Sequence, residues 1–457
     1  MPAGCSRTYR LRRVSPIPLA QLLTHTADAL LAVRSGRSLD DALARTPAEA
    51  RAGTQALAFH VLRGQGRANA LRDALASRPP PPEVDALLTV ALALLCPVDD
   101  DRAGRPPYPD HTLVDQAVAA ARQRQPAAAG FVNAVLRRFI RERDEQIAAA
   151  RRTPEGAWNH PRWWIDRLRK DWPAHWQALL AEANRHPPMT LRVNARQCSG
   201  ADYLCRLAEQ GLEAALIDDP ALAGQAVVLA VPCPVQQLPG FADGVVSVQD
   251  AAAQRAAPLL LGGPPLPPGA RVLDACAAPG GKTAHLLELA ALEVLALDRD
   301  AQRLQRVQQT LERLQLQAEL KVGDACLPAT WWDGRPFYVI LVDAPCTASG
   351  IVRRHPDIRW LRRPGDVAAL ARQQGAMLDA LWPLLAPGGR LLFATCSIFK
   401  AEGVEVSDAF LQRLGADAAR ADPSAPGNLL LLPDNQGPVP AAAALHDGFY
   451  YALIRKS

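Results

Sequence analysis

The stretch Val272-Leu-Asp-Ala-Cys-Ala-Ala-Pro-Gly-Gly-Lys-Thr283 decides how the C-terminal half of the chain folds. Its apolar start predicts a buried strand, its glycines a tight turn, and its end the first turn of a helix. The glycines allow the backbone to approach a ligand, and a helix start offers free N–H groups. A second apolar run, Val294-Leu-Ala-Leu-Asp298, ends on an acid that suits the two hydroxyls of a ribose. These features indicate a site for a cofactor that contains a nucleoside.

The turn between this strand and helix does not have the sequence of a phosphate-binding loop. A P-loop needs a glycine five residues before Gly281, where this chain has Cys276, and the turn is not a G-x-G-x-x-G sequence either. A cofactor with adenosine but without pyrophosphate fits better, and S-adenosylmethionine is the leading candidate.

From residue 256 onward, strand-like and helix-like runs alternate along the chain. The predicted strands are 271–275, 294–298, 319–323, 338–344 and 390–395, and the predicted helices are 283–291, 301–315 and 367–385. Pro387-Gly-Gly389 is expected to end the last helix, and the apolar tail 448–454 to add a strand. This order is typical of a doubly wound, Rossmann-like α/β sheet, which binds ligands at the carboxyl ends of its strands.

The N-terminal third, residues 16–150, is predicted to be an all-α bundle. Apolar residues recur there at helix spacing, and Ser38 followed by two acids offers an N-cap. Pro79-Pro-Pro-Pro82 breaks the helices, and residues 97–110 are expected to form a loop. Within Gly130–Arg138 and just beyond it, one helix face is expected to be buried. That face comprises Phe131, Val132, Val135, Leu136 and Phe139, with Arg137 and Arg138 lying off it.

Residues 151–255 mix short strand-like and helix-like runs, which predicts a small α+β linker domain. Five tryptophans fall between positions 158 and 176. Aromatic rings beside arginines can stack on RNA bases, but a tryptophan-rich helical core is the favoured interpretation. The run Val248-Gln-Asp250 is expected to start a helix near the cofactor site.

Composition restricts the class of protein. The chain has 457 residues, of which 49% are hydrophobic and 21% charged, and it has no apolar run long enough for a transmembrane span or a signal peptide. Its nine cysteines are scattered without close pairs, which argues against a disulfide framework or a zinc site and for a cytoplasmic protein. The net charge of +5 falls entirely on residues 1–150. That excess permits phosphate contacts but fits a solvated arginine-rich surface equally well.

Two cysteines end two neighbouring predicted strands. Cys346 lies in Val342-Asp-Ala-Pro-Cys-Thr-Ala-Ser-Gly350, and Cys396 lies in Phe393-Ala-Thr-Cys-Ser-Ile398. A buried cysteine is usually inert, but both of these lie at a strand-to-loop corner on the ligand side of the sheet. At the end of a third strand, Asp324 could accept a hydrogen bond from an adenine amino group, although an ordinary turn aspartate explains it as well.

Three motifs carry a resemblance to a known family. Ala277-Ala-Pro-Gly-Gly-Lys-Thr283, Asp343-Ala-Pro-Cys-Thr-Ala-Ser-Gly350 and Ala394-Thr-Cys-Ser397 resemble the signatures of RNA cytosine-5 methyltransferases of the NOL1/NOP2/Sun group. Gly130-Phe-Val-Asn-Ala-Val-Leu-Arg-Arg138 resembles the closing helix of NusB-like RNA-binding domains. The combination is similar to bacterial 16S rRNA cytosine-C5 methyltransferases, from about residue 16 to residue 456.

This resemblance implies a domain plan and a target. It implies a NusB-like helical domain at 16–150, an α+β linker or RNA-binding domain at 151–255 and a class I S-adenosylmethionine-dependent methyltransferase domain at 256–457. The implied target is a cytosine of 16S rRNA, of the cytosine 967 type. A monomer that binds RNA, with no DNA, membrane or metal partner, is expected.

The resemblance also implies roles for single residues. Cytosine C5 is a poor nucleophile, and a thiolate that adds to C6 makes C5 reactive, which requires a cysteine that can also leave. Cys396 is implied as the nucleophile, Cys346 as the residue that assists elimination, and Asp343 as the residue that holds the N3/N4 edge of the base. The implied cofactor residues are Cys276, Ala277, Ala278, Pro279, Gly280, Gly281, Lys282, Asp298, Asp324 and Asp343. Lys282 could contact either the cofactor or a target phosphate.

One departure from the family pattern and three alternatives remain. The family usually has Glu-Glu-Asn where this chain has Ala401-Glu402-Gly403, which weakens any role for the helix start there.

A DNA cytosine-5 methyltransferase would lack the second, Thr-Cys motif and the helical N-terminal domain. A non-catalytic RNA-binding or antitermination factor would have no need of the cysteines and the cofactor turn. The same chemistry on tRNA or on another rRNA position stays open.

Overall fold

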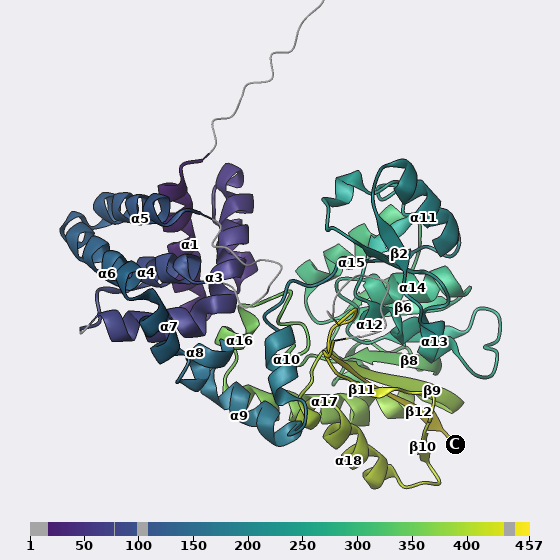
Figure 1. The fold of residues 1–457 in the computed structure, drawn as a ribbon. Coiled ribbons are helices and arrows are strands. Elements are labelled where there is room, and N and C mark those ends of the chain that lie inside the picture. Colours follow the sequence, from purple (N-terminus) through teal and green to yellow (C-terminus); the bar gives the residue numbers. More distant parts are fainter. Residues whose placement is uncertain (1–16, 77, 98–107, 434–443) are drawn as a thin grey trace, which may run out of the picture. The chain divides into compact units, whose positions relative to one another are not determined.

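The computed structural model describes residues 17–76, 78–97, 108–433 and 444–457. The chain divides after Asn159 into two compact units, which are drawn in Figure 1. Most of the loop expected at 97–110 lies outside the described residues. Within the described ranges, no helix is long and apolar enough to cross a membrane.

The N-terminal unit is helical, as predicted. Its helices are α1 (Leu19–Arg34), α2 (Leu39–Ala44), α3 (Ala48–Leu75), α4 (Pro82–Leu95), α5 (Asp110–Arg124), α6 (Ala129–Arg141), α7 (Arg143–Ala150) and α8 (Pro154–Trp158). Every residue of α4 from Ala86 to Leu95 is buried, because this helix is apolar on all sides and packs against α1, α3 and α5. Proline 82 occupies the first turn of α4, where no backbone N–H is needed.

The predicted N-cap at Ser38 is confirmed, and one position predicted to be buried was wrong. Ser38 caps α2 by accepting a hydrogen bond from the Asp41 N–H at 3.1 Å. On α6, the predicted face is buried except for Phe131, whose side chain is 38% exposed. Phe131 lies in the first turn of α6, at the edge of the buried stripe, so the bundle does not cover it.

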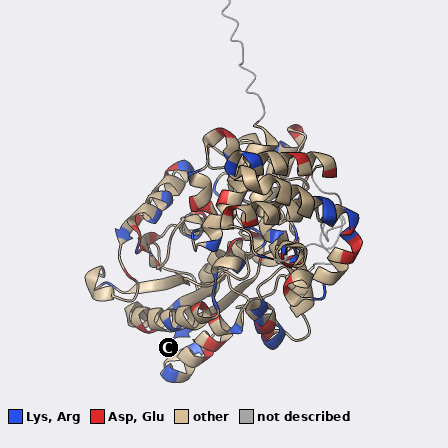
Figure 2. Cartoon of the chain, turned by 90° about the vertical axis from the view of Figure 1, so that its left-hand side faces the viewer, with Lys and Arg blue, Asp and Glu red and all other residues tan. Residues whose placement is uncertain are grey.

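The basic excess of the N-terminal unit is spread among acidic residues. Figure 2 shows Lys and Arg interspersed with Asp and Glu along the helices. Several arginines form ion pairs within the unit, among them Arg34 and Arg72 with Asp85, and Arg143 with Asp110. The excess positive charge is therefore carried by exposed arginines outside these ion pairs, such as Arg137.

The C-terminal unit begins with helices and a small sheet. Helices α9 (Arg162–Asp171) and α10 (Trp176–Glu182) precede β1 (Thr190–Val193), α11 (Gly200–Glu209), β2 (Ala214–Leu216), β3 (Ala226–Leu229) and β4 (Val246–Val248). The strands pair antiparallel in the order β2-β3-β1-β4, and α11 packs on β2 and β3. Both faces of β1 and β3 are buried, which explains the continuous apolar sequence of β3, whereas β1 also carries Thr190 and Arg192. This is the α+β element that the sequence predicts.

A second, mixed sheet forms the body of the C-terminal unit. Its strands are β5 (Arg271–Asp274), β6 (Glu293–Asp298), β7 (Glu319–Val322), β8 (Phe337–Asp343), β9 (Leu385–Thr395), β10 (Ala419–Ala421), β11 (Gly427–Leu429) and β12 (Phe449–Lys456). The order is β10-β12-β9-β8-β5-β6-β7, with β11 paired to β12. Strands β5 to β9 are parallel and β12 is antiparallel to β9, so the predicted tail strand closes one side.

Helices cover both faces of this sheet (Figure 1). They are α12 (Ala251–Gln254), α13 (Ala256–Leu261), α14 (Gly281–Leu289), α15 (Ala301–Leu314), α17 (Pro364–Leu381) and α18 (Val404–Leu414), and the short α16 (Ile358–Leu361) is not one of them. One core cluster joins the sheet to Leu260, Leu286 and Val307, and the other joins it to Met377 and Phe410. The doubly wound architecture expected from the alternating runs is confirmed.

The end of α17 differs from the expectation. The helix ends at Leu381 and a 3-10 turn follows, whereas Pro387-Gly-Gly389 lies inside β9. These three residues interrupt the pairing of β9 with β8 only locally. The two strands pair at Leu385 and pair again from Arg390 onward. Proline and glycine therefore mark an irregularity in a strand here and not a helix end.

The tryptophans of the linker region are only partly a core. Trp164 is buried and meets the Phe399 ring edge-on with the centroids 4.9 Å apart, but Trp158, Trp163, Trp172 and Trp176 are half-buried. Trp172 Nε1 donates a hydrogen bond to the carbonyl of Ile398 at 2.7 Å. Helix α9 and the residue that follows it thus support the loop that comes after Cys396.

Candidate active site

The strand β5, the turn after it and α14 form the cofactor turn expected from the sequence. Gly280 has φ +98°, and a Cβ there would lie 3.0 Å from Val307 Cα of α15, so the position requires glycine. Thr283 Oγ1 donates to Asp274 Oδ2 at 2.6 Å and holds the start of α14 to the end of β5. The Ala278–Pro279 peptide bond is cis.

A pocket of about 200 Å³ lies at the carboxyl ends of the parallel strands. It is lined by Ala275, Cys276, Ala278, Asp298, Arg299, Arg303, Gly323, Asp324, Ala325, Asp343, Ala344, Pro345, Cys346, Ala348, Gln373, Met377 and Cys396. Seven of the residues predicted from sequence are among them. The other turn residues do not line it: Ala277 is buried beneath, Pro279 is exposed, and Gly280 and Gly281 form the backbone of the turn.

Three carboxylates, those of Asp298, Asp324 and Asp343, lie at three strand ends around this pocket. Asp298 is 3% exposed and accepts hydrogen bonds from the N–H groups of Ala278 at 3.2 Å and Asp300 at 3.1 Å. Asp324 is exposed and accepts from the Cys326 N–H at 2.8 Å, so it also acts as a turn residue. Acceptors of this kind suit hydroxyl and amino groups and repel phosphates, while their negative charge suits a sulfonium. The pocket therefore fits S-adenosylmethionine.

Lys282 and Asp343 form an ion pair at the edge of the pocket. Lys282 Nζ lies 2.5 Å from Asp343 Oδ2, and the side chain of Lys282 is 12% exposed. Burial alone would lower the pKa of Lys282, but the carboxylate of Asp343 offsets this and raises the pKa above its ordinary value. The ammonium also lies 5.5 Å from the centre of the Phe449 ring. Lys282 is thus the counter-ion of Asp343, a contact that the sequence did not reveal.

The two cysteines meet between β8 and β9. Their Sγ atoms are 3.4 Å apart, and the Gly350 N–H donates to the carbonyl of Cys396 at 2.9 Å. The contact with Cys396 and burial raise the pKa of Cys346 well above its ordinary value. Cys346 is therefore a thiol at neutral pH, placed where it can donate a hydrogen bond to Cys396 Sγ.

Cys276 is the third cysteine of the pocket, and its environment makes it unreactive. Burial and the carboxylates of Asp343, Asp274 and Asp298 raise the pKa of Cys276 well above its ordinary value. A thiol that stays protonated is a poor nucleophile. In the described part of the chain, no group of three or more His, Cys, Asp or Glu side chains could hold a metal ion.

Comparison with known proteins places this site in a family. Three family models match: 16S rRNA methyltransferase RsmB/F at residues 266–455, the RsmF/B-like ferredoxin-like domain at 160–236, and the NusB family at 20–141. A Pseudomonas putida protein named Ribosomal RNA small subunit methyltransferase B is 45% identical over 446 residues, covering 94% of this chain and 97% of that protein. The chain belongs to the RsmB/F family of 16S rRNA methyltransferases. It is therefore an S-adenosylmethionine-dependent methyltransferase.

Solved structures share the fold. The crystal structure of PH0851 has a TM-score of 0.72 at 23% identity and covers 96% of this chain and 99% of that chain. The crystal structure of NSun6 from Pyrococcus horikoshii with SFG has a TM-score of 0.53 at 18% identity and covers 65% of this chain and 98% of that chain. Together with the family models, they confirm the expected helical domain, small α+β domain and methyltransferase domain.

The small sheet of this RsmB/F chain contributes directly to the cofactor turn. Arg192 on β1 is 1% exposed, and its Nη1 donates to the carbonyl of Gly281 at 2.7 Å. Its Nε and Nη2 donate to the Glu288 carboxylate of α14 at 2.9 and 2.6 Å. The ferredoxin-like domain therefore fixes the start of α14, which sequence reasoning missed because the partners are 89 and 96 residues apart.

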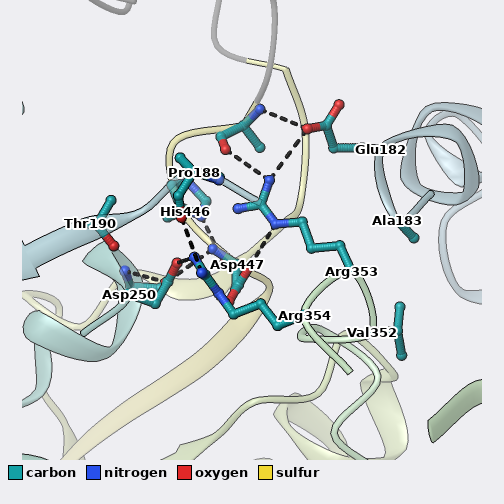
Figure 3. Close-up of polar contacts among 12 residues, drawn as sticks. Glu182, Ala183, Pro188, Thr190, Asp250, Val352, Arg353, Arg354, His446 and Asp447 are labelled. Atoms are coloured by element: carbon teal, nitrogen blue, oxygen red, sulfur yellow. Dashed lines mark hydrogen bonds and ion pairs between the residues drawn. The ribbon is translucent and has the colours of Figure 1, made fainter. Parts of the chain in front are cut away.

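Arg353 and Arg354, which follow the Cys346 motif, are structural and not free for phosphate. Figure 3 shows both guanidinium groups converging on Asp447. Arg353 Nε donates to Asp447 Oδ1 at 2.6 Å, and Arg354 Nε donates to Asp447 Oδ2 at 2.5 Å. Arg353 Nη1 also lies 3.4 Å from Glu182, and Arg354 Nη2 donates to Asp250 Oδ2 at 2.7 Å. This network joins the cysteine loop to α10, to the N-cap of α12 and to Asp447, two residues before β12.

Asp274 gives a pH-dependent prediction for stability. Burial raises the pKa of Asp274 to about 6, against the hydrogen bond from Thr283. An acid with a raised pKa stabilises the fold below its unfolded-state pKa and loses that contribution as pH rises through the folded-state pKa. The asparagine side chain introduced by Asp274→Asn is neutral at every pH. The free energy of unfolding of this variant, relative to that of wild type, should therefore rise by up to roughly 3 kcal/mol between about pH 4 and about pH 7. Urea unfolding at both pH values measures this difference.

The matched control is Asp408→Asn, which changes an exposed carboxylate on α18. Its stability relative to wild type should stay constant over the same pH range, since solvent screens an exposed charge. A constant difference for Asp274→Asn as well would contradict the burial argument.

Proposed function

We propose that this chain methylates C5 of a cytosine in 16S rRNA through a covalent bond between Cys396 and C6 of the base. The observation that supports this most is the 3.4 Å separation of the Cys346 and Cys396 sulfurs beside the pocket. Similar proteins carry the name Ribosomal RNA small subunit methyltransferase B, which favours small-subunit rRNA over tRNA. A target of the cytosine 967 type follows from the motif resemblance.

Addition of a thiolate to the base starts the reaction. Cys396 Sγ, as the thiolate, forms a bond to C6 with its own electron pair; the C5–C6 double-bond pair shifts to C4–C5, the C4–N3 pair moves onto N3, and N3 takes a proton from water, so that C5 becomes a nucleophilic enamine carbon. Asp343 holds the N3/N4 edge and is itself held by Lys282. When bound, S-adenosylmethionine supplies the methyl group that C5 takes. Cys276, Ala278, Asp298, Asp324 and Asp343 would hold it in the pocket.

Elimination then releases the product. The C5 proton passes to water, its bonding pair restores the C5–C6 double bond, and the C6–S bond breaks with its electrons staying on Cys396. Cys346, as a thiol 3.4 Å away, donates a hydrogen bond to the departing thiolate. The two cysteines thus have separate tasks: Cys396 forms the adduct and Cys346 helps to break it.

The remaining parts of the chain hold the RNA. The helical domain at 16–150 and the linker domain at 151–255 would contact the backbone and shape of the rRNA around the target, which must leave its stack to reach the cysteines. We propose a cytoplasmic monomer that acts on RNA and not on DNA.

A methylation assay with separate substrates tests this function. Purified wild-type protein and labelled S-adenosylmethionine are mixed with 16S rRNA from cells that lack the activity, with tRNA, and with a DNA copy of the rRNA. Label should enter only the 16S rRNA, and bisulfite sequencing should locate one protected cytosine. If only tRNA is labelled, tRNA and not 16S rRNA is the substrate of the same chemistry. If no RNA is labelled, the result contradicts the proposal.

A further inference from the structure

A buried carboxylate outside the proposed mechanism contacts both cysteine loops. Glu402 belongs to the short 3-10 turn Lys400–Glu402 and is 0% exposed. Its Oε1 accepts a hydrogen bond from the Thr347 N–H at 2.7 Å. Its Oε2 accepts from Ser397 Oγ at 2.7 Å and from Thr347 Oγ1. Thr347 directly follows Cys346 and Ser397 directly follows Cys396, so a single carboxylate joins the two loops.

The two loops also share direct hydrogen bonds: the Gly350 N–H donates to the Cys396 carbonyl at 2.9 Å and the Ile398 N–H donates to Ser349 Oγ at 2.9 Å. Ser349 Oγ lies 2.8 Å from Ser397 Oγ, and Arg362 donates to the carbonyls of Cys346 and Thr347 at 3.2 Å each. Arg362 therefore binds only the Cys346 loop, whereas Glu402 spans both. Thr395 Oγ1 in turn donates to the carbonyl of Glu402 at 3.0 Å, which fixes the backbone of Glu402 to the end of β9.

We propose that Glu402 is a positioning residue of the methyl-transfer site, which holds the Cys346 and Cys396 loops at the separation that product release requires. The inference rests on the proposed function and extends it to a residue in the stretch where the chain departs from the usual Glu-Glu-Asn pattern. Glu402 touches neither sulfur through a hydrogen bond, so it acts through Thr347 and Ser397.

The charge of Glu402 adds a second effect. The contact with Cys396 and burial raise the pKa of Cys346 most, and the negative charge of the nearby Glu402 raises it further. Negative charge near Cys346 disfavours its thiolate and so helps to keep Cys346 as the thiol that donates to Cys396 Sγ.

Three variants separate position from charge. Glu402→Ala removes the carboxylate that accepts from both loops. Glu402→Gln keeps it, because the amide oxygen can accept from the Thr347 N–H and the amide nitrogen can donate to the two hydroxyls. Glu405→Gln makes the same charge change at an exposed residue of α18 and serves as control.

Two readouts are measured on each variant. The first is kcat and KM for methylation of unmodified 16S rRNA, together with the amount of protein–RNA adduct on a denaturing gel. The second is the rate at which iodoacetamide alkylates Cys346 and Cys396 of the protein alone between about pH 6 and about pH 10, read by mass spectrometry.

Glu402→Ala should lower kcat by about 100-fold with KM little changed and with adduct accumulating, because a displacement of about 1 Å has this cost in rate. Glu402→Gln should recover most of the rate, while its Cys346 is alkylated several-fold faster than in wild type. If Glu402→Ala does not fold, the kcat of Glu402→Asp, whose carboxylate is one methylene shorter and cannot reach both loops, decides the question. Both Glu402→Ala and Glu402→Gln behaving like Glu405→Gln would overturn the proposal. If wild type methylates no RNA, the proposed function fails, whereas a difference in Cys346 alkylation between Glu402→Ala and Glu402→Gln, which both lack the charge, would still support the tie.

Discussion

Cys396→Ala is expected to lose methyl transfer and the covalent RNA adduct together, with a rate at least about 1,000-fold below wild type. Removal of a nucleophile leaves only the binding and orientation of the substrate, since no other group forms the covalent bond. Cys276 cannot replace it, because the raised pKa keeps Cys276 a thiol. Incorporation of labelled methyl groups and a denaturing gel measure both losses on the same sample.

Cys346→Ala is the matched variant for this experiment. It removes the other sulfur of the 3.4 Å pair and leaves Cys396 in place, so addition to C6 should proceed while release slows. Adduct should therefore accumulate in Cys346→Ala and be missing in Cys396→Ala. The reverse pattern would identify Cys346 as the nucleophile and Cys396 as the residue that assists release. Full activity of Cys396→Ala would contradict the covalent mechanism.

Arg353→Ala is expected to destabilise the C-terminal unit by about 3–5 kcal/mol. The side chain of Arg353 is 0% exposed and its guanidinium faces Asp447 and Glu182, each 1% exposed (Figure 3). Among the described residues, removal of Arg353 leaves the buried Asp447 with Arg354 and the buried Glu182 with the more exposed Arg185 as their remaining arginine partners, and the loss of one partner is a costly way to break a buried network. Urea unfolding followed by tryptophan fluorescence reports on this unit, because eight of the nine tryptophans lie in residues 160–457.

Arg413→Ala provides the comparison for that measurement. Arg413 pairs with Asp379 at 2.9 Å, but the two side chains are 48% and 53% exposed. An exposed pair contributes about 1 kcal/mol or less, so this variant should unfold close to wild type. Equal losses for the two variants would show that the buried network is not what stabilises the unit.

Several features of the fold and the site could be predicted because they are local in sequence. Helix periodicity, the Ser38 cap and the alternation of runs after residue 256 each depend on neighbours within a few positions. The motif residues at strand ends converge because the carboxyl ends of parallel strands share one edge of the sheet. Cys276, Asp298, Asp324, Asp343, Cys346 and Cys396 accordingly reach one pocket. Their roles in catalysis stay predictions.

Other expectations were wrong where burial or pairing depends on distant residues. Pro387-Gly-Gly389 has the composition of a helix end, but its neighbours in space place it in β9. Phe131 fits the apolar face of α6, but the bundle does not extend over it. The partner of Arg353 and Arg354 likewise could not be read from the sequence, because Asp447, which accepts from both, is more than 90 residues away.

The sequence by itself determined which chemistry-bearing residues exist and at which strand ends they lie. Only the tertiary structure decided their partners: Lys282 with Asp343, Arg192 with Glu288 and Gly281, and Glu402 with both cysteine loops. The reason is physical. Periodicity and turn chemistry act over a few residues, whereas the ionisation of a buried group is set by charges and hydrogen bonds that the folded chain brings together from afar.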